Sequence, residues 1–147
     1  MPNKKYELTA ECKMYFGRKL FRIKALIDFG TVKAGEFGGW IEKEENLAQD
    51  GDAWVSGDAK VYGNAKVSGD AWVSGNADYT TIKGFGTEYR NTTFFRCKDG
   101  AVRVKCGCFY GTIEEFRKQV NETRDGKIAK EYLMIADLME YHFSAEE

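Results

Sequence analysis

Basic side chains recur at every second position in two stretches of the sequence, and this spacing gathers side chains on one face of a β-strand. The stretch TTFFRCKDGAVRVKCGCFY predicts a hairpin around the Asp-Gly pair at 99–100. In the register that this turn implies, one face carries an aromatic ring and three cations: Phe94, Arg96, Arg103 and Lys105. Arg96 is expected opposite Arg103, and like charges in that position favour an anion between them. The face predicts an anion or nucleotide site with Phe94 as a stacking surface, and a solvated outer face is the alternative.

A second set of cations lies in the N-terminal stretch KYELTAECKMYFGRKLFRIKALIDF. Gly17 predicts a two-residue turn as its first central residue, with Met14 paired to Phe21. One face of this hairpin is then wholly apolar, and the opposite face carries Arg22 and Lys24. We expect these two cations to serve the same kind of anionic ligand.

Three cysteines, Cys97, Cys106 and Cys108, are candidate zinc ligands. Two of them share the C-x-C spacing of a strand and no fourth ligand is evident, so buried thiols are the simpler interpretation. His142 is the only histidine, which excludes a three-histidine metal site. The sequence has no Gly-rich phosphate loop and no nucleophile elbow. We therefore expect no metal, no cofactor and no catalytic residue, and the chain is predicted not to be an enzyme.

The stretch GDAWVSGDAKVYGNAKVSGDAWVSGNA at 51–77 repeats the hexad G-(D/N)-A-x-V-(S/Y). Ala and Val stand two apart, so in an extended chain both point the same way, and the Gly-Asp or Gly-Asn pair then turns the chain. The pattern predicts a short strand and a corner every six residues, which is typical of a parallel β-helix. A disordered linker is the alternative, but disordered chains are poor in such apolar residues.

These five hexads resemble the left-handed hexapeptide-repeat helix, in which three hexads form one triangular coil. The resemblance implies that residues eighteen apart stack, so Trp54 is expected under Trp72, and Lys60 between Glu42 and Asp78. Upstream, three apolar residues keep the phase and are expected to point inward: Phe37, Ile41 and Leu47.

The repeat also places aromatic side chains at outward positions, namely Trp54, Trp72 and Tyr62. An apolar strip of this kind is seldom left uncovered on a monomer, and either the terminal helices of the chain or a second copy could cover it. The strip predicts a homo-oligomer, with a dimer favoured and a trimer possible.

After the second hairpin, Thr112 and Glu115 form a capping box that predicts the start of a helix, and a second helix is expected over about 127–141. The predicted fold class is mainly β with C-terminal helices (α+β). Its parts are an N-terminal β-hairpin module at 1–35, a hexapeptide-repeat β-helix at 36–80, and a hairpin with two helices at 81–147.

The net charge of −1 argues against a general nucleic-acid binder, although the charge is uneven along the chain. Residues 1–34 hold eight basic and three acidic side chains, and residues 81–110 hold six and two. No apolar run approaches the ~20 residues of a membrane span, and no cleavable leader is evident. These features predict a cytoplasmic protein with reduced thiols and no membrane partner.

The segment VKAGEFGGWIEKEENL, the hexads and the segment CGCFYGTIEEF together resemble small uncharacterised proteins encoded by phages and prophages. This resemblance carries no catalytic residue and implies a binding role in a host cytoplasm. The predicted function is a non-enzymatic counter-defence protein that sequesters an anionic nucleotide signal or blocks a host defence protein. Two alternatives stay open, a structural or oligomerisation scaffold and a hexapeptide-repeat transferase-like enzyme. That enzyme family uses a histidine base, which His142, outside the repeat, matches poorly.

Overall fold

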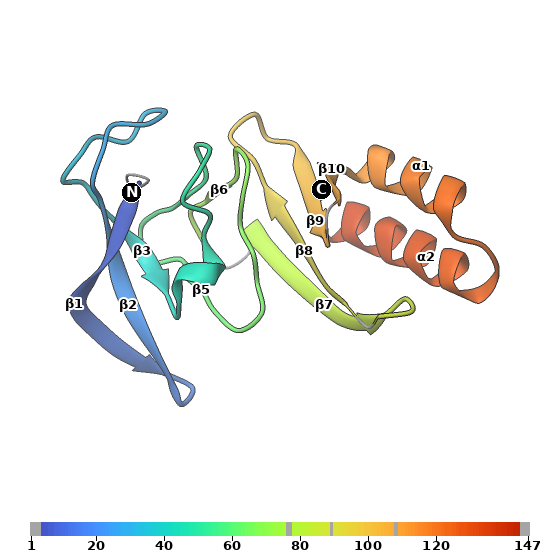
Figure 1. Cartoon of the computed structure of the whole chain (residues 1–147), viewed down its shortest axis with the longest axis horizontal. Helices are drawn as coiled ribbons and strands as arrows, with labels where there is room; N and C mark the ends of the chain where they lie inside the picture. The colour runs from blue at the N-terminus through green and yellow to red at the C-terminus, as the bar shows by residue number, and fades with distance from the viewer. Residues whose placement is uncertain (1–3, 76–77, 89, 108, 145–147) are drawn as a thin grey trace.

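The computed structural model describes residues 4–75, 78–88, 90–107 and 109–144 (Figure 1). The chain is mainly β with two C-terminal helices, which confirms the predicted α+β class. Along the long axis of the molecule the N-terminal hairpin comes first and the hexad repeat follows. A second sheet then separates the repeat from the helices (Figure 1).

The first sheet joins the N-terminal hairpin to the repeat, in the strand order β1-β2-β3-β5. Its strands are β1 (Tyr6–Tyr15), β2 (Arg18–Ala25), β3 (Phe37–Ile41) and β5 (Lys60–Val61). The β1–β2 and β2–β3 pairs are antiparallel, whereas β3 and β5 are parallel. The hairpin therefore adds two strands to one side of the repeat.

The turn of this hairpin lies one residue earlier than predicted. Phe16 and Gly17 occupy its centre with φ values of 48° and 78°, the left-handed values of a type I′ turn. Met14 consequently pairs with Lys19. The expected pairing of Met14 with Phe21 is wrong because Phe16 adopts a conformation that favours glycine or asparagine.

The predicted apolar face of the hairpin is buried only near the base of the two strands. The register shifts between Leu8 and Cys12, so that Tyr6 pairs with Ala25 at the buried end. Tyr6 is fully buried, but Met14 near the turn is 67% exposed. The hairpin end thus projects from the body of the molecule (Figure 1).

Three parallel pairings run through the repeat. Strands β4 (Trp54–Val55) and β6 (Trp72–Val73) pair with an offset of eighteen residues, as predicted for Trp54 and Trp72. The other two pairings have an offset of twenty residues and are Trp40 with Lys60 and Leu47 with Val67. The expected stacking of Lys60 on Glu42 is therefore wrong by two residues.

The offset changes because two extra residues lie between Leu47 and Trp54 in the first turn of the repeat. This longer segment holds the start of β1. The Gln49 side-chain oxygen accepts a hydrogen bond from the backbone N–H of Lys5 at 2.8 Å. The Lys5 ammonium in turn donates to the carbonyl of Ala53 at 2.6 Å.

A buried asparagine fixes the corner just before this segment. Asn46 ends the 3-10 turn η1 (Glu44–Asn46) and is 0% exposed. Its side chain accepts two backbone N–H groups and donates to two carbonyls, with partners Glu42 at 3.1 Å, Lys43 at 3.0 Å, Gly63 at 3.2 Å and Ala65 at 3.0 Å. The amide therefore ties residues 42–46 to residues 63–65 of the repeat.

The Ala and Val columns of the hexads form the core of the repeat. Every one of these residues in the described hexads is at most 1% exposed: Ala53, Ala59, Ala65, Ala71, Val55, Val61, Val67 and Val73. Ile41 and Leu47 are buried as expected, but Phe37 is 55% exposed, so its inward placement is wrong. Phe37 begins β3 opposite Lys24 and lies beyond the end of the columns.

The second sheet has the strand order β10-β9-β8-β7. Its strands are β7 (Tyr79–Phe85), β8 (Arg90–Arg96), β9 (Val102–Cys106) and β10 (Phe109–Thr112). The backbone N–H of Cys97 donates to the carbonyl of Ala101 at 2.8 Å, so three residues, and not the predicted two, close the β8–β9 turn. Gly100 supplies the left-handed conformation of this loop with φ 87°.

The central strand β8 is buried on both faces. Phe95 belongs to the hydrophobic cluster of the repeat, and Phe94 belongs to the cluster under the helices. Both rings are 0% exposed. Strand β8 therefore contributes side chains to both hydrophobic cores.

Helices α1 (Ile113–Thr123) and α2 (Gly126–His142) cover the far face of this sheet (Figure 1). The predicted capping box is present: Thr112 Oγ1 accepts from the Glu115 N–H at 3.1 Å, and the Glu115 carboxylate accepts from the Thr112 N–H at 2.8 Å. Arg117 of α1 joins the helices through Asp137 at 2.8 Å and Glu140 at 2.6 Å. Neither helix combines the length and the apolar character needed to cross a membrane.

Candidate functional site

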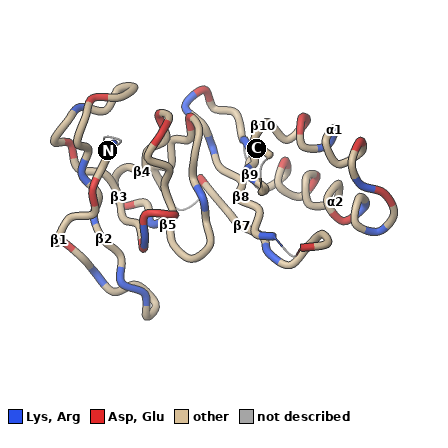
Figure 2. The backbone as a smooth tube through the Cα atoms, viewed as in Figure 1, with Lys and Arg blue, Asp and Glu red and all other residues tan. Residues whose placement is uncertain are grey.

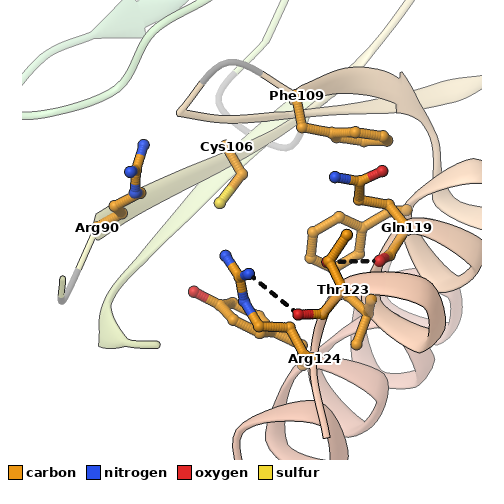
Figure 3. Close-up of a pocket in the computed structure, with 9 residues that line it drawn as sticks. Arg90, Cys106, Phe109, Gln119, Thr123 and Arg124 are labelled. Carbon is orange, nitrogen blue, oxygen red and sulfur yellow. Dashed lines mark hydrogen bonds between the residues drawn. The ribbon is translucent and has the colours of Figure 1, made fainter. Parts of the chain in front are cut away.

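A cavity of about 200 Å³ lies between the second sheet and the two helices (Figure 3). Strands β8, β9 and β10 supply one side of it, and α1, the following turn and α2 supply the other. Its lining combines two guanidinium groups, a thiol and polar helix residues with an apolar floor: Arg90, Cys106, Phe109, Phe116, Gln119, Val120, Thr123, Arg124 and Tyr132. Five elements and one turn therefore build the cavity.

Aromatic rings form the floor of the cavity and hold the helices to the sheet. Phe116 meets Tyr132 edge to face at 5.7 Å between ring centroids and lies 5.7 Å from Phe109. The Tyr132 hydroxyl donates to the carbonyl of Phe85 at 3.1 Å. A Cβ atom on Gly86 would stand 2.5 Å from that hydroxyl, so only glycine allows Tyr132 to approach the strand end.

Polar groups converge on the space above this floor. The Thr92 hydroxyl donates to Cys106 Sγ at 3.2 Å, which orients the thiol from the sheet side. Arg124 lies at the junction of α1 and α2, with its Nη1 at 3.5 Å from the carbonyl of Thr123. Figure 3 shows Cys106 and Arg90 on the sheet side of the cavity and Thr123 and Arg124 on the helix side.

The electrostatic effect of the two guanidinium groups reaches Tyr132. Burial raises the pKa of Tyr132, and Cys106 adds to this effect, while the charges of Arg124 and Arg90 act in the opposite direction. Arg90 also forms an ion pair with Glu88 at the edge of the sheet. The cavity thus presents positive charge above an apolar floor, which suits a small anion with an apolar part.

The structure separates Arg96 from Arg103, which the sequence placed opposite each other. Because the β8–β9 turn has three residues, Arg96 pairs with Val102, and Phe95 pairs with Arg103. The two arginines therefore lie on opposite faces of the sheet. The predicted like-charge pair does not exist.

Each of these arginines also has carboxylate partners. Arg96 Nε lies 3.3 Å from Asp78, and Arg96 Nη2 donates to the carbonyl of Phe143 at 3.3 Å. Arg103 contacts Asp99 at 3.0 Å and Asp70 at 3.5 Å. Both cations help to hold neighbouring elements together.

Asp70 and Arg103 belong to a polar cluster where the repeat meets the sheet. The Tyr110 hydroxyl donates to Asp70 at 2.7 Å. Burial raises the pKa of Asp70, but the Tyr110 and Cys97 hydrogen bonds and the charge of Arg103 outweigh this effect and lower it overall. Burial raises the pKa of Cys97 to about 11, so this thiol stays protonated at neutral pH.

Phe94 and Lys105 do not share a face either. Phe94 pairs with Val104 and is fully buried against Phe116, with ring centroids 6.1 Å apart. Its prediction as an exposed stacking surface is wrong, because the helices cover this face of β8 while the repeat covers the other. Lys105 pairs with Thr93 and lies half-buried on the opposite face.

Arg22 and Lys24 lie in the first sheet, at the other end of the repeat from the cavity (Figure 1). Arg22 Nε donates to the carbonyl of Gly38 at 3.1 Å, and its guanidinium lies 5.2 Å from the Trp40 ring centroid. Lys24 lies 5.7 Å from the ring centroid of Phe37. The six predicted anion-binding residues therefore do not form one site.

The predicted interface aromatics differ in exposure. Trp54 is 0% exposed and contacts Phe29 at 5.3 Å between ring centroids, so it is covered within the chain and its predicted place at a subunit interface is wrong. The loop that carries Phe29 folds over this side of the repeat, which the hexad pattern cannot reveal. Trp72 and Tyr62 are partly buried. The homo-oligomer stays a prediction and now depends on those two residues.

No group of three or more metal-ligating side chains exists among the described residues. Cys97 is buried in the repeat core, and Cys106 lines the cavity, so the two thiols point to opposite sides of the sheet. Cys108 lies outside the described residues. His142 is exposed at the end of α2, with its ring beside Phe143 at 5.0 Å between centroids.

The cavity was missed because its lining residues are scattered over the sequence from residue 90 to residue 132. Of the lining residues, only Cys106 was a candidate site residue in the sequence, as a zinc ligand with C-x-C spacing. A weak signal was available in Arg124, which stands at the predicted break between the helices.

No family model matches the chain. It is 40% identical over 60 residues to an uncharacterized acetyltransferase, YdcK, of Escherichia coli K12. That match covers 35% of this chain and 18% of the relative, so the chain spans less than a fifth of the relative's length. The likeness contradicts the predicted non-enzymatic, phage-type binding function and favours the transferase-like alternative, which the sequence analysis had placed last. The phage resemblance itself is untouched by this comparison.

Proposed function

We propose that the chain is a transferase-like hexapeptide-repeat protein in which the cavity holds a small anionic acyl acceptor. The likeness to an acetyltransferase is the observation that carries this proposal. It departs from the prediction that the chain is not an enzyme.

The pairings of the repeat support a hexapeptide coil. The chain forms parallel pairs at three successive places, each with a partner eighteen or twenty residues later. The Ala and Val columns between these places are buried together. We infer that the three places are the sides of one left-handed coil, because hexads in this phase make three sides per turn.

The lining of the cavity supports the class of acceptor. Its volume of about 200 Å³ is below the roughly 300 to 1,000 Å³ of pockets that enclose drug-sized ligands, so it suits a small molecule. Arg90 and Arg124 offer planar donors to a carboxylate, while Phe116 and Tyr132 contact an apolar part. The acetyl donor of this transfer is a thioester, acetyl-coenzyme A. The acceptor nitrogen or oxygen bonds to the acetyl carbonyl carbon, the carbon–sulfur bond of the thioester breaks, and the acceptor's proton ends on the released thiol.

The test is release of coenzyme A from acetyl-coenzyme A in the presence of small amino acids and aminobenzoates. Chromatographic detection of coenzyme A avoids interference from the protein's own thiols. We expect Arg124→Gln to raise the KM for the acceptor about ten- to a hundredfold, since it removes a charge-assisted hydrogen bond. Lys33→Gln, which removes a surface cation of the loop before β3, is the control and should have no effect. Unchanged KM in Arg124→Gln would remove the cavity from the proposal.

A scaffold role is the second candidate. The one histidine is exposed at the end of α2 and no described histidine contacts the repeat, so the base that the hexapeptide transferases use has no counterpart there. Absence of coenzyme A release with every acceptor would favour this candidate.

A further inference from the structure

The end of the β1–β2 hairpin, residues 14–19, exposes large apolar side chains. Phe16 is 88% exposed and Met14 is 67% exposed. This hairpin tip projects beyond the body of the molecule (Figure 1). Phe16 meets Tyr15 edge to face at 4.6 Å between ring centroids, but neither Phe16 nor Met14 is buried, so packing in the core explains neither side chain.

Phe16 is also a poor choice for the backbone it occupies. Its φ of 48° lies in the left-handed region, where an aromatic side chain is strained. In a type I′ turn the first central residue is most often asparagine, and glycine follows, as Gly17 does here. The tip thus carries an exposed aromatic where asparagine would fold better, which points to a role in contact with something else.

The tip lies within a strongly basic segment. Residues 12–24 contain five cations and no carboxylate (Figure 2). Two of these cations reach carboxylates elsewhere, since Arg18 lies 3.0 Å from Glu42 and Arg22 lies 3.5 Å from Glu11. Lys19 stands beside the turn, with its Nζ 5.5 Å from the ring centroid of Phe21.

We propose that the hairpin tip docks on the surface of an anionic lipid bilayer. Phe16 and Met14 enter the boundary between headgroups and acyl chains, and Lys19 lies at the level of the anionic headgroups. Apolar side chains at the point of a projection with cations at their flanks match the two layers of such a surface. A protein partner would require an apolar pocket that fits these side chains, whereas a bilayer accepts an apolar tip of any shape.

This docking goes beyond the proposed function and does not depend on it. The prediction of no membrane partner rests on the lack of a long apolar run in the sequence. That argument concerns spans that cross a bilayer and does not bear on a turn that touches one leaflet.

The test is sedimentation of the full chain with vesicles of phosphatidylcholine, with and without phosphatidylglycerol. We expect roughly tenfold or stronger partitioning onto the anionic vesicles, and this preference should weaken at high salt. Equal partitioning onto both kinds of vesicle, or onto neither, would overturn the proposal.

Phe16→Asn is the decisive variant because asparagine suits the turn. It should raise the melting temperature and lower vesicle binding at least about fivefold, since the buried apolar area of the anchor is lost. The control is Met134→Ser on α2, which removes a side chain of similar exposure, 60%, far from the tip. Unchanged vesicle binding in Phe16→Asn would overturn the proposal. So would a tip that holds two copies together, seen as a drop in mass by light scattering in Phe16→Asn.

Discussion

Lys5 is a buried amine whose hydrogen bonds go to backbone carbonyls of the repeat. Its Nζ donates to Ala53 at 2.6 Å and to Asp50 and Gly51 at 3.4 Å. Burial lowers the pKa of Lys5 to about 8, against the opposing effect of Asp50 and Asp52. The cation is therefore held at an energetic cost by a segment that the hexad pattern does not predict.

This shift gives a dependence of stability on pH. Between pH 8 and 10.5 the unfolded chain still binds the Lys5 proton while the folded chain has lost it, so raising the pH stabilises the fold. We expect the free energy of unfolding of the native chain to gain up to about 1.4 kcal/mol per pH unit relative to Lys5→Met in this range. Urea unfolding at several pH values measures the difference. Lys4→Met, at an exposed neighbour, should follow the native curve.

The Asn46 side chain should contribute more to the free energy of unfolding than the side chain of Asn64. Asn46→Ala removes a buried amide that bonds two backbone N–H groups and two carbonyls, and of these the Glu42 N–H keeps a bond to the carbonyl of Val61 at 3.2 Å. We therefore expect a loss of about 2 to 4 kcal/mol in the free energy of unfolding. Asn64→Ala, at an exposed position of a regular hexad, serves as the control. Similar urea midpoints for the two variants would show that water replaces the Asn46 contacts.

At the scale of residues, the helix cap could be predicted from the sequence, whereas the exact positions of the hairpin turns could not. The capping box at Thr112 was predicted correctly because both partners are local in sequence. The two hairpin turns were misjudged by one residue each, because Phe16 takes a conformation that its type disfavours and because Gly100 closes a three-residue loop. The second error placed Arg103 and Lys105 on the face of Phe94, where the structure has Val102 and Val104.

At the scale of elements, the hexad columns were predictable and the close approaches between strands were not. Gly38 in β3 is an example, because a Cβ there would stand 2.6 Å from both the Trp54 ring and the carbonyl of Val55. We expect Gly38→Ala to cost at least about 2 kcal/mol by overpacking. Gly75→Ala, where a Cβ meets nothing within 4 Å, should be nearly neutral in thermal unfolding. A neutral Gly38→Ala would mean that β3 and β4 can move apart freely.

The stacking of hexads can be tested by cross-linking. Ser56 follows the Val55–Val73 pair, so Ser56→Cys with Ser74→Cys places two thiols on adjacent parallel strands, within the reach of a disulfide. Mass spectrometry of the oxidised chain should find this link. Ser56→Cys with Ser68→Cys, twelve residues apart, should not form one. The reverse pattern would rule out three hexads per coil.

The cavity shows why sites of this kind escape a reading of sequence. Its two arginines come from the start of β8 and the junction of the helices, and the register of the sheet decides which side chains of β9 join them. A repeat can be recognised in the sequence from its period. A cavity lined by five elements forms only when the sheet and helices pack, and no local pattern marks it.

At the scale of the molecule, strand β8 joins two cores that would otherwise fold separately. All three tryptophans lie in the N-terminal sheet and the repeat, whereas both helices lie on the other side of β8. We expect Phe94→Ala to cost about 3 to 5 kcal/mol and to lower the urea midpoints of tryptophan fluorescence and helical circular dichroism together. Phe95→Ala should do the same from the opposite face. Different urea midpoints for fluorescence and circular dichroism in the native chain would show that the two cores unfold independently.

The offset of eighteen residues between Trp54 and Trp72 has a geometric consequence for how such a chain can change length. In the proposed three-sided coil, an insertion of eighteen residues would return the backbone to the same side of the repeat, one strand spacing further along, so the second sheet would keep its orientation toward the hairpin. An insertion of six or twelve would instead turn the sheet and helices by a third or two thirds of a revolution. In this proposed coil, the number of hexads therefore sets both the distance and the rotation angle between the hairpin tip and the cavity.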